Sequence, residues 1–162
     1  MARQKTLSAS DAAFRLCNDT CLAVERRMVE VPFAKLPIEY RTVWLVWGAG
    51  GIIDNGGFEF LFECSVDEDP SFAKSAAAFD EIGCSAASKA FGKAFALFPR
   101  ARVIKDHDRR VEYYRSVPEG KREPINSAFW KASRCGKGEI TARLAKYIRK
   151  NKAVFADLKK QE

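Results

Sequence analysis

The chain has 162 residues, of which 47% are hydrophobic, so it is long enough to bury the core of one domain. No apolar run reaches the roughly 18 residues that a membrane-spanning helix needs. The polar start of the chain also lacks the apolar region of a signal peptide. We therefore expect a cytoplasmic protein of a single domain, residues 1–162, with no membrane partner.

Charge is distributed unevenly along the chain. The net charge of +7 combines +2 for residues 1–50, −7 for residues 51–83 and +12 for residues 84–162. If this separation survives folding, the surface carries two opposed fields; otherwise the fold brings acids and bases together and they neutralise each other. The sequence leaves both outcomes open.

Helical spacing of apolar residues dominates the first half of the chain. A first helix is expected at about residues 10–28, with Ser8 or Ser10 as its N-cap. Pro37 suits the first turn of a second helix, which we expect to be interrupted or ended by the glycines in residues 48–51. The five cysteines have irregular spacing and fit reduced thiols. A metal or redox role for Cys17 and Cys21, which share a helix face, is the alternative.

The segment Asp54-Asn55-Gly56-Gly57-Phe58 predicts a sharp corner that opens into an aromatic run. Glycine adopts backbone angles that other residues avoid, and an Asn before it favours a turn or a helix cap. We expect Asn55 to cap, Gly56 and Gly57 to bend the chain, and Phe58 to anchor the segment that follows.

The second half of the chain also has helical periodicity. Residues 100–106 are expected to form a connector and residues 118–121 a turn, and Gly83 is a natural C′ residue. The strict alternation of apolar and polar residues that marks a strand is scarce. The sequence therefore predicts an all-α fold of about seven to eight helices in an orthogonal or bundle-like array. Further helices are expected at about 72–82, 85–98, 108–116, around 125–130, and from 139 onward with an interruption at Asn151.

Three patterns resemble catalytic, cofactor or metal sites. The glycines of residues 43–51 could follow a strand in a dinucleotide loop, but Ile53 stands at the third glycine position and no βαβ context is present. His107 lies between Asp106 and Asp108, which suits a metal or an acid–base pair. Adjacent helical residues do not converge, however, so a polar helix start is the favoured interpretation. We expect no catalytic residue, cofactor or metal site.

Two charged clusters are candidate binding surfaces. The acidic residues lack the ligand spacing of a calcium loop and would either solubilise the chain or bind a partner. The basic residues could neutralise phosphates of a nucleic acid or form a solvated face. The acidic candidates are Glu59, Glu63, Asp67, Glu68 and Asp69, and the basic candidates are Arg109, Arg110, Arg143, Lys146, Arg149 and Lys150.

The corner resembles the Asn-Gly-Gly-Phe motif of the bacterial DNA mimic protein family, a helical family long catalogued as a domain of unknown function. The resemblance continues in order over about residues 37–158, and the first helix, about residues 10–28, is expected to pack on this region. The matching residues of the resemblance are Phe60-Leu61-Phe62, Glu81-Ile82-Gly83, Leu97-Phe98-Pro99, Phe129-Trp130, Tyr147-Ile148, Asn151 and Phe155.

The resemblance implies a non-enzymatic fold that presents carboxylates in place of DNA phosphates to a DNA-binding protein. This chain departs from that pattern, because it is basic overall and has Phe60 where the family often has Gln. The residues therefore favour a protein-interaction module that is not a global DNA mimic. The alternative is a nucleic-acid-binding protein that uses its basic C-terminal half, and a homodimer also stays open.

Overall fold

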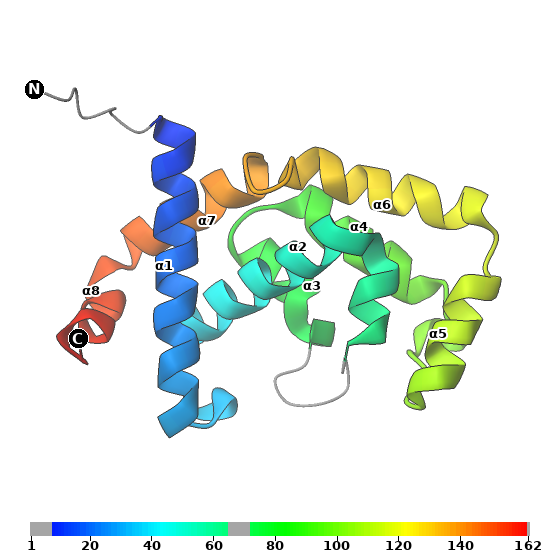
Figure 1. Ribbon diagram of the computed structural model, residues 1–162, viewed down its shortest axis with the longest axis horizontal. Helices are drawn as coiled ribbons and strands as arrows, with labels where there is room; N and C mark the ends of the chain where they lie inside the picture. Colours follow the sequence, from blue (N-terminus) through cyan, green and yellow to red (C-terminus); the bar gives the residue numbers. More distant parts are fainter. Residues whose placement is uncertain (1–7, 65–71, 162) are drawn as a thin grey trace, which may run out of the picture.

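Eight α-helices and no strands make up residues 8–64 and 72–161, the part of the chain that the computed structural model describes (Figure 1). The predicted all-α class is therefore confirmed. None of the described helices is long and apolar enough to cross a membrane. The helices are α1 (Ala9–Glu30), α2 (Ile38–Glu63), α3 (Ser75–Glu81), α4 (Ser85–Ala96), α5 (His107–Ser116), α6 (Glu119–Ser133), α7 (Glu139–Lys150) and α8 (Lys152–Phe155).

Helix α2 is the central element, because it contacts α1, α3, α5, α6 and α7. Helix α1 crosses α7 and the first half of α2 at one end of the molecule, near α8 (Figure 1). Helix α5 lies at the opposite end, and α6 runs from there back toward α7. The arrangement separates the α5 end from the α1–α8 end along the longest axis.

Helix α1 starts where its sequence predicts. The Ser8 hydroxyl oxygen accepts a hydrogen bond from the Asp11 amide at 3.1 Å, as an N-cap does. Cys17 and Cys21 are both buried on the face that packs on the core, and burial raises the pKa of each thiol to about 12. They therefore stay protonated at neutral pH and pack as small apolar groups.

Phenylalanines fill the space between α2, α3, α4 and α6. The ring of Phe58 lies 5.1 Å from that of Phe91 and 5.7 Å from that of Phe129, in edge-to-face contacts. Phe79 contacts the same two rings, and all four side chains are fully buried. Such pairs add about 0.5–1.5 kcal/mol beyond the burial of their area, so this cluster fixes how the four helices meet.

The predicted interruption at residues 48–51 is wrong, because α2 continues through all four of them. Glycine in a helix interior costs about 1 kcal/mol relative to alanine. Burial of Val46, Ala49 and Ile53 on the same helix outweighs that cost. Gly48 also leaves room for a neighbour, since a Cβ at this position would lie 3.2 Å from the ring of Phe72.

The break in α2 lies instead at the predicted corner. Gly56 has φ −158° and ψ 20°, and Gly57 has φ 67° and ψ −166°, a combination that is essentially restricted to glycine. Asn55 does not cap the second half of the helix as expected. Its side-chain amide points backward and donates to the Gly51 carbonyl at 2.8 Å.

The cap comes from α6, far away in sequence. In a regular helix the Phe58 amide would donate to the carbonyl four residues earlier; here the side-chain oxygen of Asn126 accepts it at 3.0 Å. A Cβ at Gly57 would lie only 2.9 Å from that same side-chain amide. Glycine is therefore required at position 57 by both its backbone angles and its neighbour.

Two further residues of α6 hold the other side of the corner. The indole N–H of Trp130 donates to the Ile53 carbonyl at 2.9 Å, and the Ser133 hydroxyl donates to the Asp54 carboxylate. Burial raises the pKa of Asp54. Together with Asn126, these residues recur at four- and three-residue spacing, so one face of α6 holds the corner.

The α3–α4 connection forms as its sequence predicts. Gly83 has φ 76° and lies just past the end of α3. The Gly83 amide donates to the Asp80 carbonyl and the Cys84 amide donates to the Phe79 carbonyl, both at 2.8 Å. This pair of hydrogen bonds is the Schellman arrangement that terminates a helix at a left-handed glycine.

The start of α6 differs from expectation. Residues 118–121 do not form a separate turn; Pro118 is the N-cap and Glu119 is the first residue of the helix. Proline tolerates this position because the first amides of a helix have no intrahelical partner. The helix ends at Ser133, because Arg134 and Cys135 take left-handed angles with φ 48° and 52°.

Replacing Gly57 with alanine should destabilise the fold by about 1–3 kcal/mol, because alanine can neither adopt the observed angles nor fit beside Asn126. Gly51→Ala is the matched control. Gly51 is helical and exposed, and no atom lies within 4 Å of an added Cβ. The Gly51→Ala substitution should therefore stabilise the fold by up to about 1 kcal/mol. Urea unfolding of both variants measures this, and equal effects would contradict the assignment of the corner to Gly57.

Candidate functional site at the junction of α2 and α5

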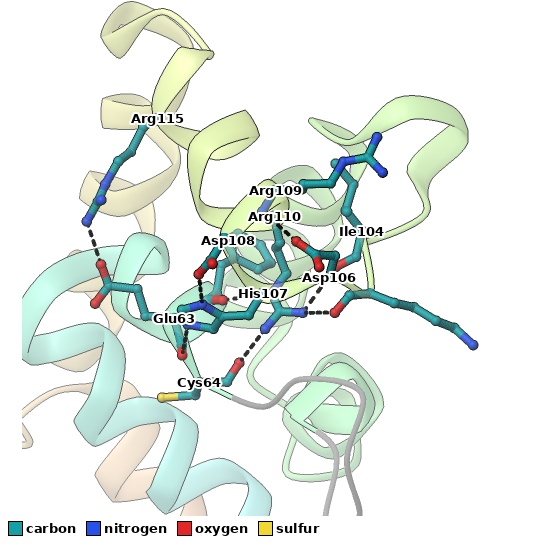
Figure 2. A network of polar contacts seen from close by, with 11 residues as sticks. Glu63, Cys64, Ile104, Asp106, His107, Asp108, Arg109, Arg110 and Arg115 are labelled. Atoms are coloured by element: carbon teal, nitrogen blue, oxygen red, sulfur yellow. Dashed lines mark hydrogen bonds and ion pairs between the residues drawn. The ribbon is translucent and has the colours of Figure 1, made fainter.

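The end of α2 and the start of α5 meet in a network of charged side chains (Figure 2). Asp106 begins α5 as its N-cap, since its carboxylate accepts from the Arg109 amide at 2.9 Å. This confirms the predicted polar helix start around His107. Because α5 packs beside α2, its side chains reach the last turn of α2.

Arg110 is the centre of this network and is only 3% exposed. Its guanidinium donates to the carbonyls of Phe62 at 2.7 Å and Cys64 at 3.1 Å, at the end of α2. It also donates to the carbonyls of Ile104 at 3.1 Å and Lys105 at 2.9 Å. The last carbonyls of a helix lack intrahelical partners, and the planar fork of arginine supplies donors for several of them.

This burial corrects one sequence-based assignment. The sequence places Arg110 among residues that could contact nucleic acid, but its donors are directed at backbone carbonyls inside the protein. Its neighbour Arg109 is exposed, as such a contact would require. Sequence could not separate the two, because two of the carbonyl partners of Arg110, those of Phe62 and Cys64, lie more than forty residues earlier in the chain.

His107 lies beside Arg110 and joins the two helices at the surface. Its Nε2 lies 3.0 Å from the Glu63 carbonyl oxygen, and its Nδ1 lies 2.9 Å from an Asp108 carboxylate oxygen. The hydrogen bond to Asp108, followed by that to Glu63, raises the pKa of His107. No group of three metal-ligating side chains occurs here or elsewhere in residues 8–64 and 72–161.

The predicted acidic residues that the structure describes are paired with arginines. Glu59 accepts from Arg115 at 2.7 Å and from Arg122 at 3.2 Å, and Glu63 accepts from Arg115 at 2.6 Å. In this region, therefore, the fold brings acids and bases together and partly neutralises both. The remaining predicted acids, Asp67, Glu68 and Asp69, lie outside the described residues.

An open hollow of about 620 Å³ borders this network. Its lining includes the carboxylates of Glu63, Asp108 and Glu112, together with His107 and Arg115. Asp108 and Glu112 are separated by one turn of α5 and are exposed. Sequence analysis missed these two as members of an acidic face, although their four-residue spacing on a predicted helix was a usable signal.

The predicted basic residues do not form one surface. Arg143, Lys146, Arg149 and Lys150 are exposed on α7, whereas Arg109 lies on α5 at the opposite end of the molecule (Figure 1). Arg143 also pairs with Glu139 one turn earlier, at 3.1 Å. Of the predicted basic residues, those on α7 share one helix, and Arg109 lies apart from them.

The fold defines a helical protein whose central helix is broken at an Asn-Gly-Gly-Phe corner and held there by a later helix. The chain belongs to the DMP19-like protein family, whose model matches residues 34–151. This match confirms the resemblance to the DNA mimic protein family. Comparisons with curated proteins and with solved structures gave no match.

Truncating Arg110 should destabilise the protein by about 2–4 kcal/mol, because Arg110→Ala leaves several backbone carbonyls without their buried donor. Arg109→Ala removes the same charge from an exposed position of the same helix and should change stability by less than about 0.5 kcal/mol. Urea unfolding distinguishes the two, and a small effect of Arg110→Ala would refute its capping role.

The stabilising contribution of His107 should depend on pH. Because hydrogen bonds to Asp108 and Glu63 raise the pKa of His107 in the folded state, protonation favours folding. This contribution is complete below the unfolded-state pKa of about 6.5 and is lost as pH rises through the folded-state pKa. The stability difference between wild type and His107→Ala should therefore be larger at pH 5 than at pH 8, measured by urea unfolding. A larger difference at pH 8 would contradict the hydrogen-bond assignment.

Proposed function

We propose that this chain is a non-enzymatic protein-interaction module that binds a basic, DNA-binding protein through the hollow between α2 and α5. The observation that carries the proposal is the gathering of Glu63, Asp108 and Glu112 from two helices around one hollow. DNA-binding proteins present Lys and Arg to phosphates, and carboxylates complement the same cations. Membership of the DMP19-like family supports this role.

The proposed recognition is local, because the chain as a whole has a net charge of +7. Glu59 is committed to Arg115 and Arg122, and Glu63 shares Arg115. The Asp108 side chain, in contrast, is 97% exposed and pairs with the ring of its neighbour His107. Asp108 and Glu112 are therefore the centre of the proposed interface. Asp67, Glu68 and Asp69 remain part of the proposal on sequence alone.

Reversing the charge at the hollow should abolish this binding. The double variant Asp108→Lys, Glu112→Lys is compared with Glu25→Lys, Asp80→Lys, which makes the same change in net charge at exposed sites on α1 and α3. Immobilised protein captures DNA-binding proteins from a lysate of the cells that encode it, and short duplex DNA is used for elution. Wild type and the control should retain a protein that the duplex releases, and the hollow variant should retain about tenfold less.

Two results would contradict the proposal. One is equal capture by the hollow variant and the wild type. The other is capture that duplex DNA does not reverse, since a partner that recognises carboxylates in place of phosphates must release them when phosphates compete. The circular dichroism and unfolding midpoints of both double variants confirm that each is folded.

The exposed face of α7 supports a second candidate function, direct binding of nucleic acid. Arg143, Lys146, Arg149 and Lys150 gather there, and only Glu139 of the same helix opposes them. In a mobility-shift assay, affinity for duplex DNA should fall as salt rises, and Lys146→Glu, Lys150→Glu should reduce that salt dependence. Undetectable affinity at low salt, or affinity independent of salt, would eliminate this candidate.

A further inference from the structure

A groove of about 750 Å³ runs between α1 and the C-terminal helices α7 and α8. It lies at the end of the molecule opposite α5 and shares no lining residue with the hollow described above (Figure 1). The volume falls within the range of about 300–1,000 Å³ typical of small-molecule sites.

One wall of the groove is a second stripe of α1. The first stripe, which includes Cys17 and Val24, is buried in the core. The second contributes Leu16 and Ala23, both half-buried, and Leu22, which is 47% exposed. From Leu16 to Ala23 these apolar side chains span about 10 Å at 1.5 Å per residue, with Asp19 and Thr20 between them. A short apolar strip is therefore left uncovered by the described part of the fold.

The opposite wall is also apolar. Its largest apolar members are Ile148 from α7, Phe155 from α8 and Leu158 from the segment that follows, and all three are largely buried. Phe155 is held in place by stacking on Tyr40, with ring centroids 5.4 Å apart. The two walls together offer apolar contact on both sides of a bound chain.

Charge is concentrated at the edges of the groove. Its lining includes three cationic side chains, those of Arg26, Arg149 and Lys152, and one carboxylate, that of Asp19. Arg149 and Lys152 are exposed and lie near the junction of α7 and α8. An anionic group bound there is favoured over a cationic one, and an apolar tail would extend along Leu16, Leu22 and Ala23.

We propose that this groove binds a single-tailed anionic amphiphile, such as a medium-chain fatty acid, with its carboxylate at Arg149 and Lys152. The volume is large enough for one acyl chain, and the apolar strip would line part of its length. A stable protein interface needs about 800 Å² of surface from each partner. A groove bounded by two or three turns of α1 provides far less surface than that. The proposal is independent of the function assigned to the hollow.

Isothermal titration calorimetry with dodecanoate, below its micellar concentration, tests the proposal on the full chain. Wild type should bind one molecule saturably. Ala23→Leu fills the apolar strip without changing charge and should weaken binding about tenfold. Arg149→Glu should weaken it at least as much, whereas Lys146→Glu, the same change on α7 outside the groove, should alter affinity less than about twofold.

The cation dodecyltrimethylammonium separates a built site from general detergent binding. It has the same tail as dodecanoate with the opposite head-group charge, so wild type should bind it at least about tenfold more weakly. Equal binding of both amphiphiles, a non-saturable isotherm, or equal losses in Arg149→Glu and Lys146→Glu would overturn the proposal. An acidic peptide that competes with dodecanoate but binds more tightly would also overturn it. The head-group comparison needs only wild type, so it tests the proposed site even if a variant fails to fold.

Discussion

The hydrogen bond from the Phe58 amide to the side chain of Asn126 is the contact on which the rest of this structure depends. It replaces the backbone partner that α2 gives up where Gly57 leaves helical geometry. With Trp130 bonded to Ile53, it ties both sides of the corner to α6. Without such partners the corner would leave buried polar groups unsatisfied, at about 1–3 kcal/mol each. The Asn-Gly-Gly-Phe motif is therefore an architectural joint.

The new direction of α2 after the corner determines the chemistry of the α5 end. Phe58 and Phe62 enter the aromatic core, so Glu59 and Glu63 emerge on the side facing α5 and α6. There Arg115 neutralises part of their charge, while Arg110 caps the end of α2. The acidic hollow and its arginine neighbours are consequences of the same joint. A chain of net charge +7 can in this way still present a local carboxylate surface.

Sequence predicted the parts of this structure that depend on local chemistry. The N-cap at Ser8, the left-handed Gly83 and the break at Gly56 and Gly57 all follow from short-range preferences. Sequence failed where a distant contact decides. Burial carries α2 through its earlier glycines, and Asn126 rather than Asn55 supplies the cap. Sequence offered no sign that Arg110 is buried, because two of its carbonyl partners lie at the end of another helix, α2.

Native-state hydrogen exchange at the Phe58 amide tests the role of the joint most directly. An amide at a simple helix break exchanges through local opening, whereas one that is part of the cooperative core exchanges only with global unfolding. The structure predicts that the Phe58 amide in wild type opens with a free energy close to that of global unfolding, and that Asn126→Ala lowers this value. Rapid exchange of the Phe58 amide in wild type, or exchange unchanged by Asn126→Ala, would contradict the account.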